Sequence, residues 1–294
     1  MPAAREVRCP CGALNDEGFA TCIRCGSPLG AEAAGAKPAR VLYRPAAEAP
    51  PRNGPAVFLI GGLCAAVFSF QIALALKSGK MPALLGASSR ADAVRVGALE
   101  YAPEAWMNEP WRLLSAGFVH FGILHFVLNM MTLVWLARTA EHLVGSARTL
   151  SSFIVTSVAG FTLTLAVSVA LGDDRGITAG ASAGILGIMG LIIGVLVRRR
   201  DPRWKPFAIQ GVFYTFIFGF AVNVSNVGIA VNNAAHLGGL LAGLALGLAW
   251  GGASGEREGP ITRGLAGLLL AGSIGSLVLS QASSRWHSFA ATVL

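Results

Sequence analysis

The segment ITAGASAGILGIMGLIIGVLV, residues 177–197, contains no Asp, Glu, Lys or Arg. About 20 apolar residues of helix cross the roughly 30 Å hydrocarbon core of a bilayer, where an unpaired backbone group finds no water. The segment is therefore predicted to span a membrane. Further segments of this kind lie at about 55–76, 113–137, 150–171, 207–229, 234–251 and 264–282.

The composition of the whole chain agrees with this prediction. Hydrophobic residues make up 54% of its 294 residues and charged residues 13%, whereas soluble domains carry about 25% charged residues. An ordinary soluble enzyme is therefore excluded. We expect an all-α polytopic membrane protein.

The net charge of +8 does not indicate nucleic-acid binding, because the basic residues are segregated. Most lie in the N-terminal tail and in alternate loops, including the run Arg198–Arg200. Loops on the cytoplasmic side are enriched in Lys and Arg. The pattern predicts a multi-pass protein of the cell membrane (plasma or inner), with a cytoplasmic N-terminus and the C-terminus outside. Its surroundings are expected to be lipid.

Four cysteines occur in two close pairs near the N-terminus, at Cys9, Cys11, Cys22 and Cys25. Such pairs suit tetrahedral zinc, and cysteines in the reducing cytosol seldom form disulfides. Residues 1–30 are therefore predicted to form a zinc-ribbon-like module with structural zinc, whose own partner the sequence does not identify. One residue separates Cys9 from Cys11 where zinc ribbons usually have two, and unligated thiols are the alternative. Residues 31–54 are predicted to be a flexible linker.

Polar residues inside transmembrane segments are costly and are candidates for function. With the predicted topology, three sets lie at similar depth near the outer face: His125 and Asn129 with His120, then Ser182, then His236. A serine hydroxyl becomes a nucleophile when a hydrogen-bonded histidine takes its proton. Ser182 and His236 are therefore candidates for nucleophile and base. The alternative for GASAG is close packing of small residues.

Two glycine rows would bring Ser182 and His236 together. Gly239, Gly243 and Gly247 share a helix face with His236, and a comparable row of Ala183, Gly187, Gly190 and Gly194 follows Ser182. Small faces let membrane helices approach closely. His125 and Asn129, four residues apart, share a face and are candidates to hold an oxyanion, with hydrogen bonding between helices as the alternative.

These motifs resemble those of the rhomboid protease family over about residues 55–251. The resemblance rests on Trp111-Arg112 followed by His120, His125 and Asn129, on Gly180-Ala181-Ser182-Ala183-Gly184, on Ala235-His236-Leu237-Gly238-Gly239, and on Glu141 as a buried acidic residue. It implies a six-helix core with one additional helix in residues 252–294. It also implies a serine endopeptidase that cleaves transmembrane segments of other proteins near the outer face, with no cofactor for catalysis. The Ser182 amide, His125 and Asn129 would hold the oxyanion.

Two other functions remain open, a catalytically inactive relative that binds transmembrane clients and a transporter. The family resemblance also implies a mobile fifth span beside the second. That span is rich in aromatic residues, and we expect one or two near its outer end to contact the second span, with lipid-facing rings as the alternative. The residues are Phe207, Phe213, Tyr214, Phe216, Phe218 and Phe220.

Overall fold

The structure is a computed structural model that describes residues 6–9, 14–16, 20–22, 28–29, 54–80, 84, 89–225, 231–252 and 258–290. The chain divides into two compact units, Met1–Pro50 and Pro51–Leu294. The finer boundaries expected at residues 30, 54 and 251 stay predictions.

The N-terminal unit contains a short antiparallel hairpin. Strand β1 (Glu6–Arg8) pairs with β2 (Leu14–Asp16), with Val7 opposite Asn15. A separate bridge joins Thr21 to Pro28. Cys9 directly follows β1 and Cys22 directly follows Thr21, so both described cysteines of this unit lie at the end of a paired segment.

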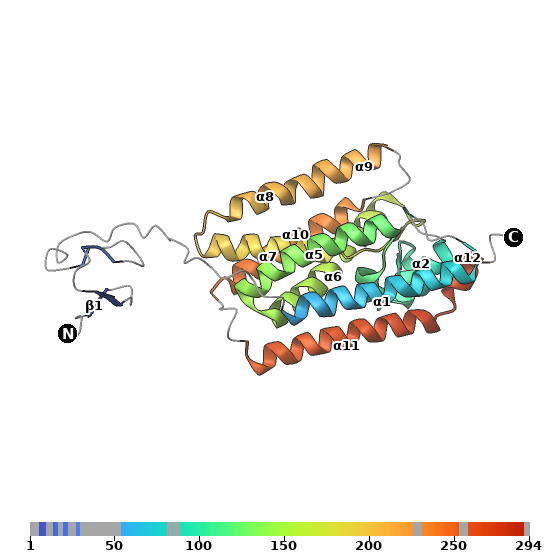
Figure 1. The fold of residues 1–294 in the computed structure, drawn as a ribbon. Coiled ribbons are helices and arrows are strands. Elements are labelled where there is room, and N and C mark those ends of the chain that lie inside the picture. The colour runs from blue at the N-terminus through green and yellow to red at the C-terminus, as the bar shows by residue number, and fades with distance from the viewer. Residues whose placement is uncertain are drawn as a thin grey trace. The chain divides into compact units, whose positions relative to one another are not determined.

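The second unit is a bundle of apolar helices whose axes run roughly side by side (Figure 1). Within the described residues, six helical stretches are long and apolar enough to cross a membrane, so this is a polytopic, essentially all-helical membrane protein. They are α1 (Pro55–Lys77), α5 (Ile123–Val144), α6 (Ser146–Leu171), the stretch Trp204–Val224, α10 (Asn233–Trp250) and α11 (Pro260–Ala282). The C-terminal helix α11 thus has the full length of a membrane span.

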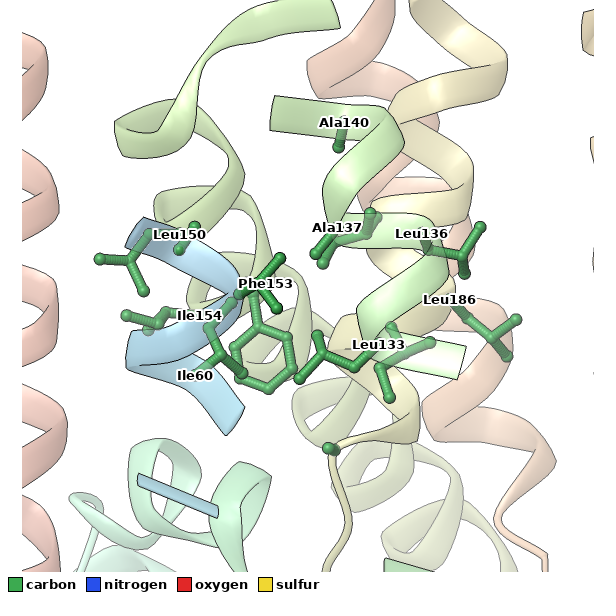
Figure 2. Close-up of a cluster of buried hydrophobic side chains, with 14 of the residues drawn as sticks. Ile60, Leu133, Leu136, Ala137, Ala140, Leu150, Phe153, Ile154 and Leu186 are labelled. Atoms are coloured by element: carbon green, nitrogen blue, oxygen red, sulfur yellow. The ribbon is translucent and has the colours of Figure 1, made fainter. Parts of the chain in front are cut away.

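A seventh apolar helix, α7 (Ser182–Arg198), is 17 residues long and lies at the centre of the bundle. It contacts α5, α6 and α10, and its residues 183–196 are all buried. A helix that is apolar on every side is stable only when neighbours surround it. Its residue Leu186 belongs to a buried hydrophobic cluster with residues of α1, α5 and α6. Figure 2 shows Leu186 together with Ile60, Leu133, Leu136, Ala137, Ala140, Leu150, Phe153 and Ile154 of this cluster.

The fifth stretch is a composite helix. It consists of α8 (Trp204–Val212), a π-helical segment η3 (Phe213–Phe218) and α9 (Gly219–Ser225). In Figure 1 it lies on the side of the bundle opposite α11. In η3 and α9 the described aromatic side chains are exposed, from 42% for Tyr214 to 65% for Phe220, whereas Trp204 and Phe207 in α8 are partly buried.

The second span differs from its prediction at 113–137. The chain forms α4 (Arg112–Ser115), the 3-10 turn η2 (Ala116–Phe118) and a bend at Gly122 before α5 begins at Ile123. Gly122 has φ 90°, in the region that glycine adopts at little cost. Hydropathy alone does not separate this buried loop from a helix. The shift also places Arg138 and Glu141 in the last turns of α5, although the predicted span excluded charged residues.

The long connection from α1 to α5 is folded against the bundle. It contains α2 (Arg90–Val96), β3 (Leu99–Glu100) and α3 (Pro103–Asn108), and β3 pairs with β4 (Ile177–Thr178). Arg112 is completely buried beneath it, and its guanidinium bonds to Glu109 Oε2 at 2.5 Å and to two backbone carbonyls. Such a buried cation organises the surrounding backbone.

The C-terminal segment also bonds to the connection between α1 and α5. At the end of α11, Gln281 donates to the Arg95 carbonyl at 3.0 Å. Ser283 bonds to Glu109 at 2.5 Å, and Arg285 at the start of α12 (Arg285–Ala290) bonds to Glu100 at 3.1 Å. The additional helix is thus part of the same packed unit.

Candidate active site

Ser182 is the first residue of α7 and directly follows a buried turn at Gly180 and Ala181. Gly180 has φ 141°, which glycine tolerates and other residues rarely adopt. Its backbone N–H donates to the Ala116 carbonyl at 2.9 Å, and Thr178, just upstream, lies in β4. These contacts hold the segment that leads into Ser182. Ser182 remains partly accessible, while Ala181 and Ala183 are buried.

His236 lies in the first turn of α10 and is buried. Its Nε2 atom is 2.9 Å from Ser182 Oγ. That distance is normal for a hydrogen bond between a hydroxyl and an imidazole nitrogen. Residues 54 positions apart in sequence are thus in direct contact.

The contact results from close docking of α7 and α10. A Cβ atom added at Gly239, Gly243 or Gly247 would collide with the backbone of α7, at the carbonyls of Ala183, Gly187 and Leu191. Gly190 and Gly194 meet the Leu240 and Leu244 carbonyls in the same way. The packing predicted from the two glycine rows is therefore found.

Gly184 and Gly187 differ from this pattern. A Cβ at Gly184 would meet Ser157 and Phe153, and one at Gly187 would meet Thr156. All three neighbours belong to α6. These two glycines therefore let α6 approach α7, and Gly184 contributes close packing as well as the compact start of the helix.

His125 borders the nucleophile turn. A Cβ at Gly180 would lie 2.8 Å from His125 Cε1 and 3.0 Å from Nε2. The Phe121 N–H donates to Nδ1 at 3.2 Å, so a neutral ring carries its proton on Nε2. An N–H donor is therefore available on the side that faces Gly180.

Asn129 is buried on the same helix, one turn further along. Its side-chain amide donates to the His125 carbonyl at 2.8 Å. No hydrogen bond joins Asn129 to Ser182 in the described part of the chain. Its expected oxyanion contact would require this amide to turn toward the substrate.

His120 lies beside this pair, outside any helix. Its ring centroid is 5.3 Å from that of His125, and its Nε2 atom is buried without a partner among the described residues. Gln71 of α1 bonds to both the N–H and the carbonyl of His120, at 3.2 and 3.0 Å. A lone glutamine in an apolar span was the sequence signal for this interaction, and the sequence reasoning missed it.

The far side of His236 lacks a carboxylate partner in the described structure. Nδ1 has no hydrogen bond of normal geometry there, although the Tyr214 backbone comes near the ring. Asp173 and Asp174, the acids nearest to Ser182 in the preceding loop, are exposed, and Asp173 accepts from the Arg175 N–H. The pair is therefore a dyad in geometry.

The remaining motif residues support the fold at a distance from the dyad. Glu141 accepts hydrogen bonds from the N–H groups of Gly54 and Ala56, at 3.1 and 2.7 Å, and so caps α1. Arg112 organises the connection before α5, and the Trp111 indole Nε1 is buried. These contacts give Glu141 and Arg112 structural roles and no part in the reaction.

The expected zinc ligands are only partly described. Cys9 and Cys22 are buried in the N-terminal unit, whereas Cys11 and Cys25 lie outside the described residues. Within the part of the chain that the structure covers, no group of three or more His, Cys, Asp or Glu could hold a metal ion. The zinc site stays a prediction.

Comparison with known proteins agrees with the geometry. The rhomboid domain family matches residues 107–252. The chain is 32% identical over 150 residues to RHOMBOID-like protein 6, mitochondrial, of Arabidopsis thaliana, which covers 50% of this chain and 46% of that protein. It is 30% identical over 157 residues to the rhomboid protease GluP of Bacillus subtilis, which covers 53% of this chain and 29% of GluP.

A third relative is Rhomboid-like protease 5 of Toxoplasma gondii, 29% identical over 150 residues, which cover 50% of this chain and 17% of that protein. The matched region thus spans less than half of each of these curated relatives. The family match over residues 107–252 contains both motifs of the dyad and the helices that hold them. The chain therefore carries a rhomboid domain and belongs to the rhomboid family of membrane proteins.

Proposed function

We propose that this protein is an intramembrane serine endopeptidase that cleaves transmembrane segments of other membrane proteins. The observation that carries the proposal is the 2.9 Å contact between Ser182 Oγ and His236 Nε2. A buried imidazole beside a partly accessible hydroxyl is the arrangement that activates serine for acyl transfer. The family includes proteases, since two of the relatives above bear that name.

The reaction follows from the two side chains. Ser182 Oγ attacks the carbonyl carbon of the scissile peptide while its proton moves to His236 Nε2. The imidazolium then gives this proton to the leaving amine as the C–N bond breaks. Water, deprotonated by the same nitrogen, hydrolyses the acyl ester and restores the Ser182 hydroxyl.

The oxyanion would be held by donors that surround the turn. The Ser182 N–H lies at the first position of α7, where helix geometry supplies no acceptor within the helix and the dipole favours negative charge. His125 Nε2 is the second donor, because it faces Gly180. Asn129 is the third, after its amide leaves the His125 carbonyl.

Two other functions compete with this proposal. A catalytically inactive relative that binds transmembrane clients needs neither the serine nor the histidine, so a hydrogen-bonded pair favours the protease. A transporter commonly uses charged residues inside its spans. The buried Glu141 is instead engaged with the first turn of α1, which favours a structural role for it.

Substrate access and orientation belong to the same proposal. The dyad lies at the starts of α7 and α10, and the distribution of basic residues assigns this end to the outer side of the cell membrane. Substrates would therefore be cut near the outer face, after local unwinding of their helix exposes the backbone. The C-terminus of this chain would lie on that side as well.

The test uses purified protein in detergent or in liposomes. A fluorophosphonate probe should label wild-type protein at Ser182, and a model transmembrane substrate should be cut. Ser182→Ala should abolish labelling and cleavage, and His236→Ala should abolish cleavage, each without unfolding the protein. Wild-type cleavage by either folded variant would refute the proposal, and wild-type protein that is neither labelled nor active would favour client binding.

The oxyanion donors allow a graded test. Removing one such donor in a soluble protease costs about 2.7–4 kcal/mol of transition-state stabilisation. His125→Ala and Asn129→Ala should therefore slow cleavage without abolishing it, because other donors remain. If both variants cleave at the wild-type rate, these two side chains do not hold the oxyanion.

A further inference from the structure

Asn232 lies four residues before His236 and caps the helix that carries it. Its Oδ1 atom accepts a hydrogen bond from the Ala235 N–H at 2.9 Å. Asparagine is among the favoured residues at this position, because its oxygen satisfies an N–H that the helix leaves unpaired. The contact fixes which side of the amide is oxygen, and so directs the NH₂ group away from α10.

The NH₂ group of Asn232 faces a cluster of hydroxyls from three separate segments. Nδ2 is 2.9 Å from Thr178 Oγ1 in β4 and 3.0 Å from Thr164 Oγ1 in α6. Tyr101, which follows β3, lies further away at 3.4 Å. The Thr164 hydroxyl can donate its own proton to the Gly160 carbonyl at 3.1 Å or to Asn232 Oδ1 at 3.2 Å, and its oxygen can accept from Asn232 Nδ2 when the proton goes to Gly160.

Thr178 connects this cluster to the nucleophile. It lies four residues before Ser182 and pairs with Leu99 across the β3–β4 ladder. Gly180 is held two residues later by the Ala116 carbonyl. A single amide therefore joins the segment that leads into Ser182 to the turn that leads into His236. Thr178 lies four residues before Ser182, and Asn232 lies four residues before His236.

We infer that Asn232 is a positioning residue that sets the placement of His236 relative to Ser182. A carboxylate fixes the imidazole in many serine proteases, but Nδ1 of His236 has no such partner among the described residues. The position of the ring then depends on where the backbone of α10 begins. Asn232 determines that position through its contacts with Thr178 and Thr164. The inference rests on the proposed protease function.

Two substitutions separate this role from helix capping. Serine is also a favoured capping residue, so Asn232→Ser keeps a cap for α10 but is too short to bond to Thr178. Thr178→Val removes the same contact from its other side with little change of shape. Thr162→Val is the matched control, because Thr162 is exposed on α6 and its hydroxyl donates to the Val158 carbonyl of its own helix.

The readouts are the rate of fluorophosphonate labelling, kcat and KM for a transmembrane substrate, and the melting temperature, all on the full chain. A displacement of about 1 Å at a reacting group can cost on the order of 100-fold in rate. Asn232→Ser and Thr178→Val should each lower labelling rate and kcat roughly 10- to 100-fold, with KM and melting temperature close to wild type. The double variant should be little slower than either single one, because both remove one contact.

The outcomes distinguish the inference from the function on which it rests. Wild-type labelling rates and kcat in Asn232→Ser and Thr178→Val would overturn the positioning role while leaving the protease proposal intact. A loss of kcat that follows a lowered melting temperature, or an equal loss in Thr162→Val, would overturn it too, because the effect would then be structural. Wild-type protein that is never labelled at Ser182 would refute the protease proposal, and the positioning inference with it.

Discussion

Gly239→Ala is the substitution that tests most directly whether helix docking creates the dyad. Gly239 lies one turn after His236 on the face of α10 that meets α7. A Cβ at this position would overlap the carbonyl oxygen of Ala183, the residue next to Ser182, and would lie 2.9 Å from its carbonyl carbon. Because both obstacles are backbone atoms, no side-chain rotation relieves the overlap.

The size of the effect follows from the two distances involved. Ordinary contact with a Cβ begins at 3.4 Å, so the two helices must separate by about 1 Å at this point. The Ser182–His236 hydrogen bond is 2.9 Å long, and the same separation would stretch it to about 4 Å, beyond hydrogen-bond range. We expect kcat to fall roughly 100-fold and stability to fall by about 1–3 kcal/mol through overpacking.

The assay is cleavage of a model transmembrane substrate by purified protein, with a thermal melt to measure the folded fraction. Gly62→Ala is the matched control, because it places the same methyl group on α1 with no atom within 4 Å. The control should keep wild-type activity and be unchanged or slightly more stable. Wild-type turnover in Gly239→Ala would refute the reasoning, since the dyad would then not depend on this contact.

Three further predictions concern regions away from the dyad. Glu141→Gln should lower the free energy of unfolding by about 1–2 kcal/mol, because an amide cannot accept from both Gly54 and Ala56. Melting curves of Glu141→Gln should show this loss. Glu104→Gln is the control, because Glu104 is exposed, and its melting curve should match that of the wild type. Purified full-length protein should contain about one zinc per chain, and Cys9→Ser with Cys22→Ser should remove the metal without changing cleavage. Phe216→Ala and Phe220→Ala should raise turnover by loosening a gate, with stability changes within about 0.5 kcal/mol because both rings are at least half exposed. A crosslink between α5 and α9 that leaves turnover unchanged would contradict gating.

The apolar spans were predictable because length and missing charge report directly on the bilayer. The prediction failed at residues 113–122, where an equally apolar segment forms short turns. Arg112 is the physical reason, since a fully buried guanidinium gathers backbone carbonyls from distant parts of the connection. Such interactions depend on tertiary structure and leave no periodic pattern in the sequence.

The glycine rows were also predictable, because the spacing of small residues on one helix face has few other causes. The partner of each glycine was less certain, and Gly184 and Gly187 in fact admit α6. The expected contact between the second span and aromatic side chains near the outer end of the fifth span stays a prediction. Trp135 of α5 and Phe207, near the start of α8, are in ring contact.

The long-range hydrogen bonds of Asn232 and Glu258 could not be predicted from the sequence. Asn232 stands at a recognisable cap position, but nothing in the sequence reveals that Thr178 and Thr164 would converge on it. Glu258 accepts from the N–H groups of Ala147 and Arg148, at 2.9 and 2.8 Å, and so caps α6 from a residue 110 positions away. Contacts across such separations require the fold to be known.

The way these caps are distributed bears on the chemistry. The helix starts at α1 and α6 are each occupied by a carboxylate, from Glu141 and Glu258. The three helices that begin at the dyad, α5, α7 and α10, have no acidic residue in their first turns, and α10 is capped by the neutral Asn232. The positive ends of these helix dipoles therefore lie near Ser182 and His236, and the described first turns place no carboxylate there. A negative charge that develops on a substrate carbonyl would be the anion at this site, so the oxyanion is stabilised without placing a costly cation inside the membrane.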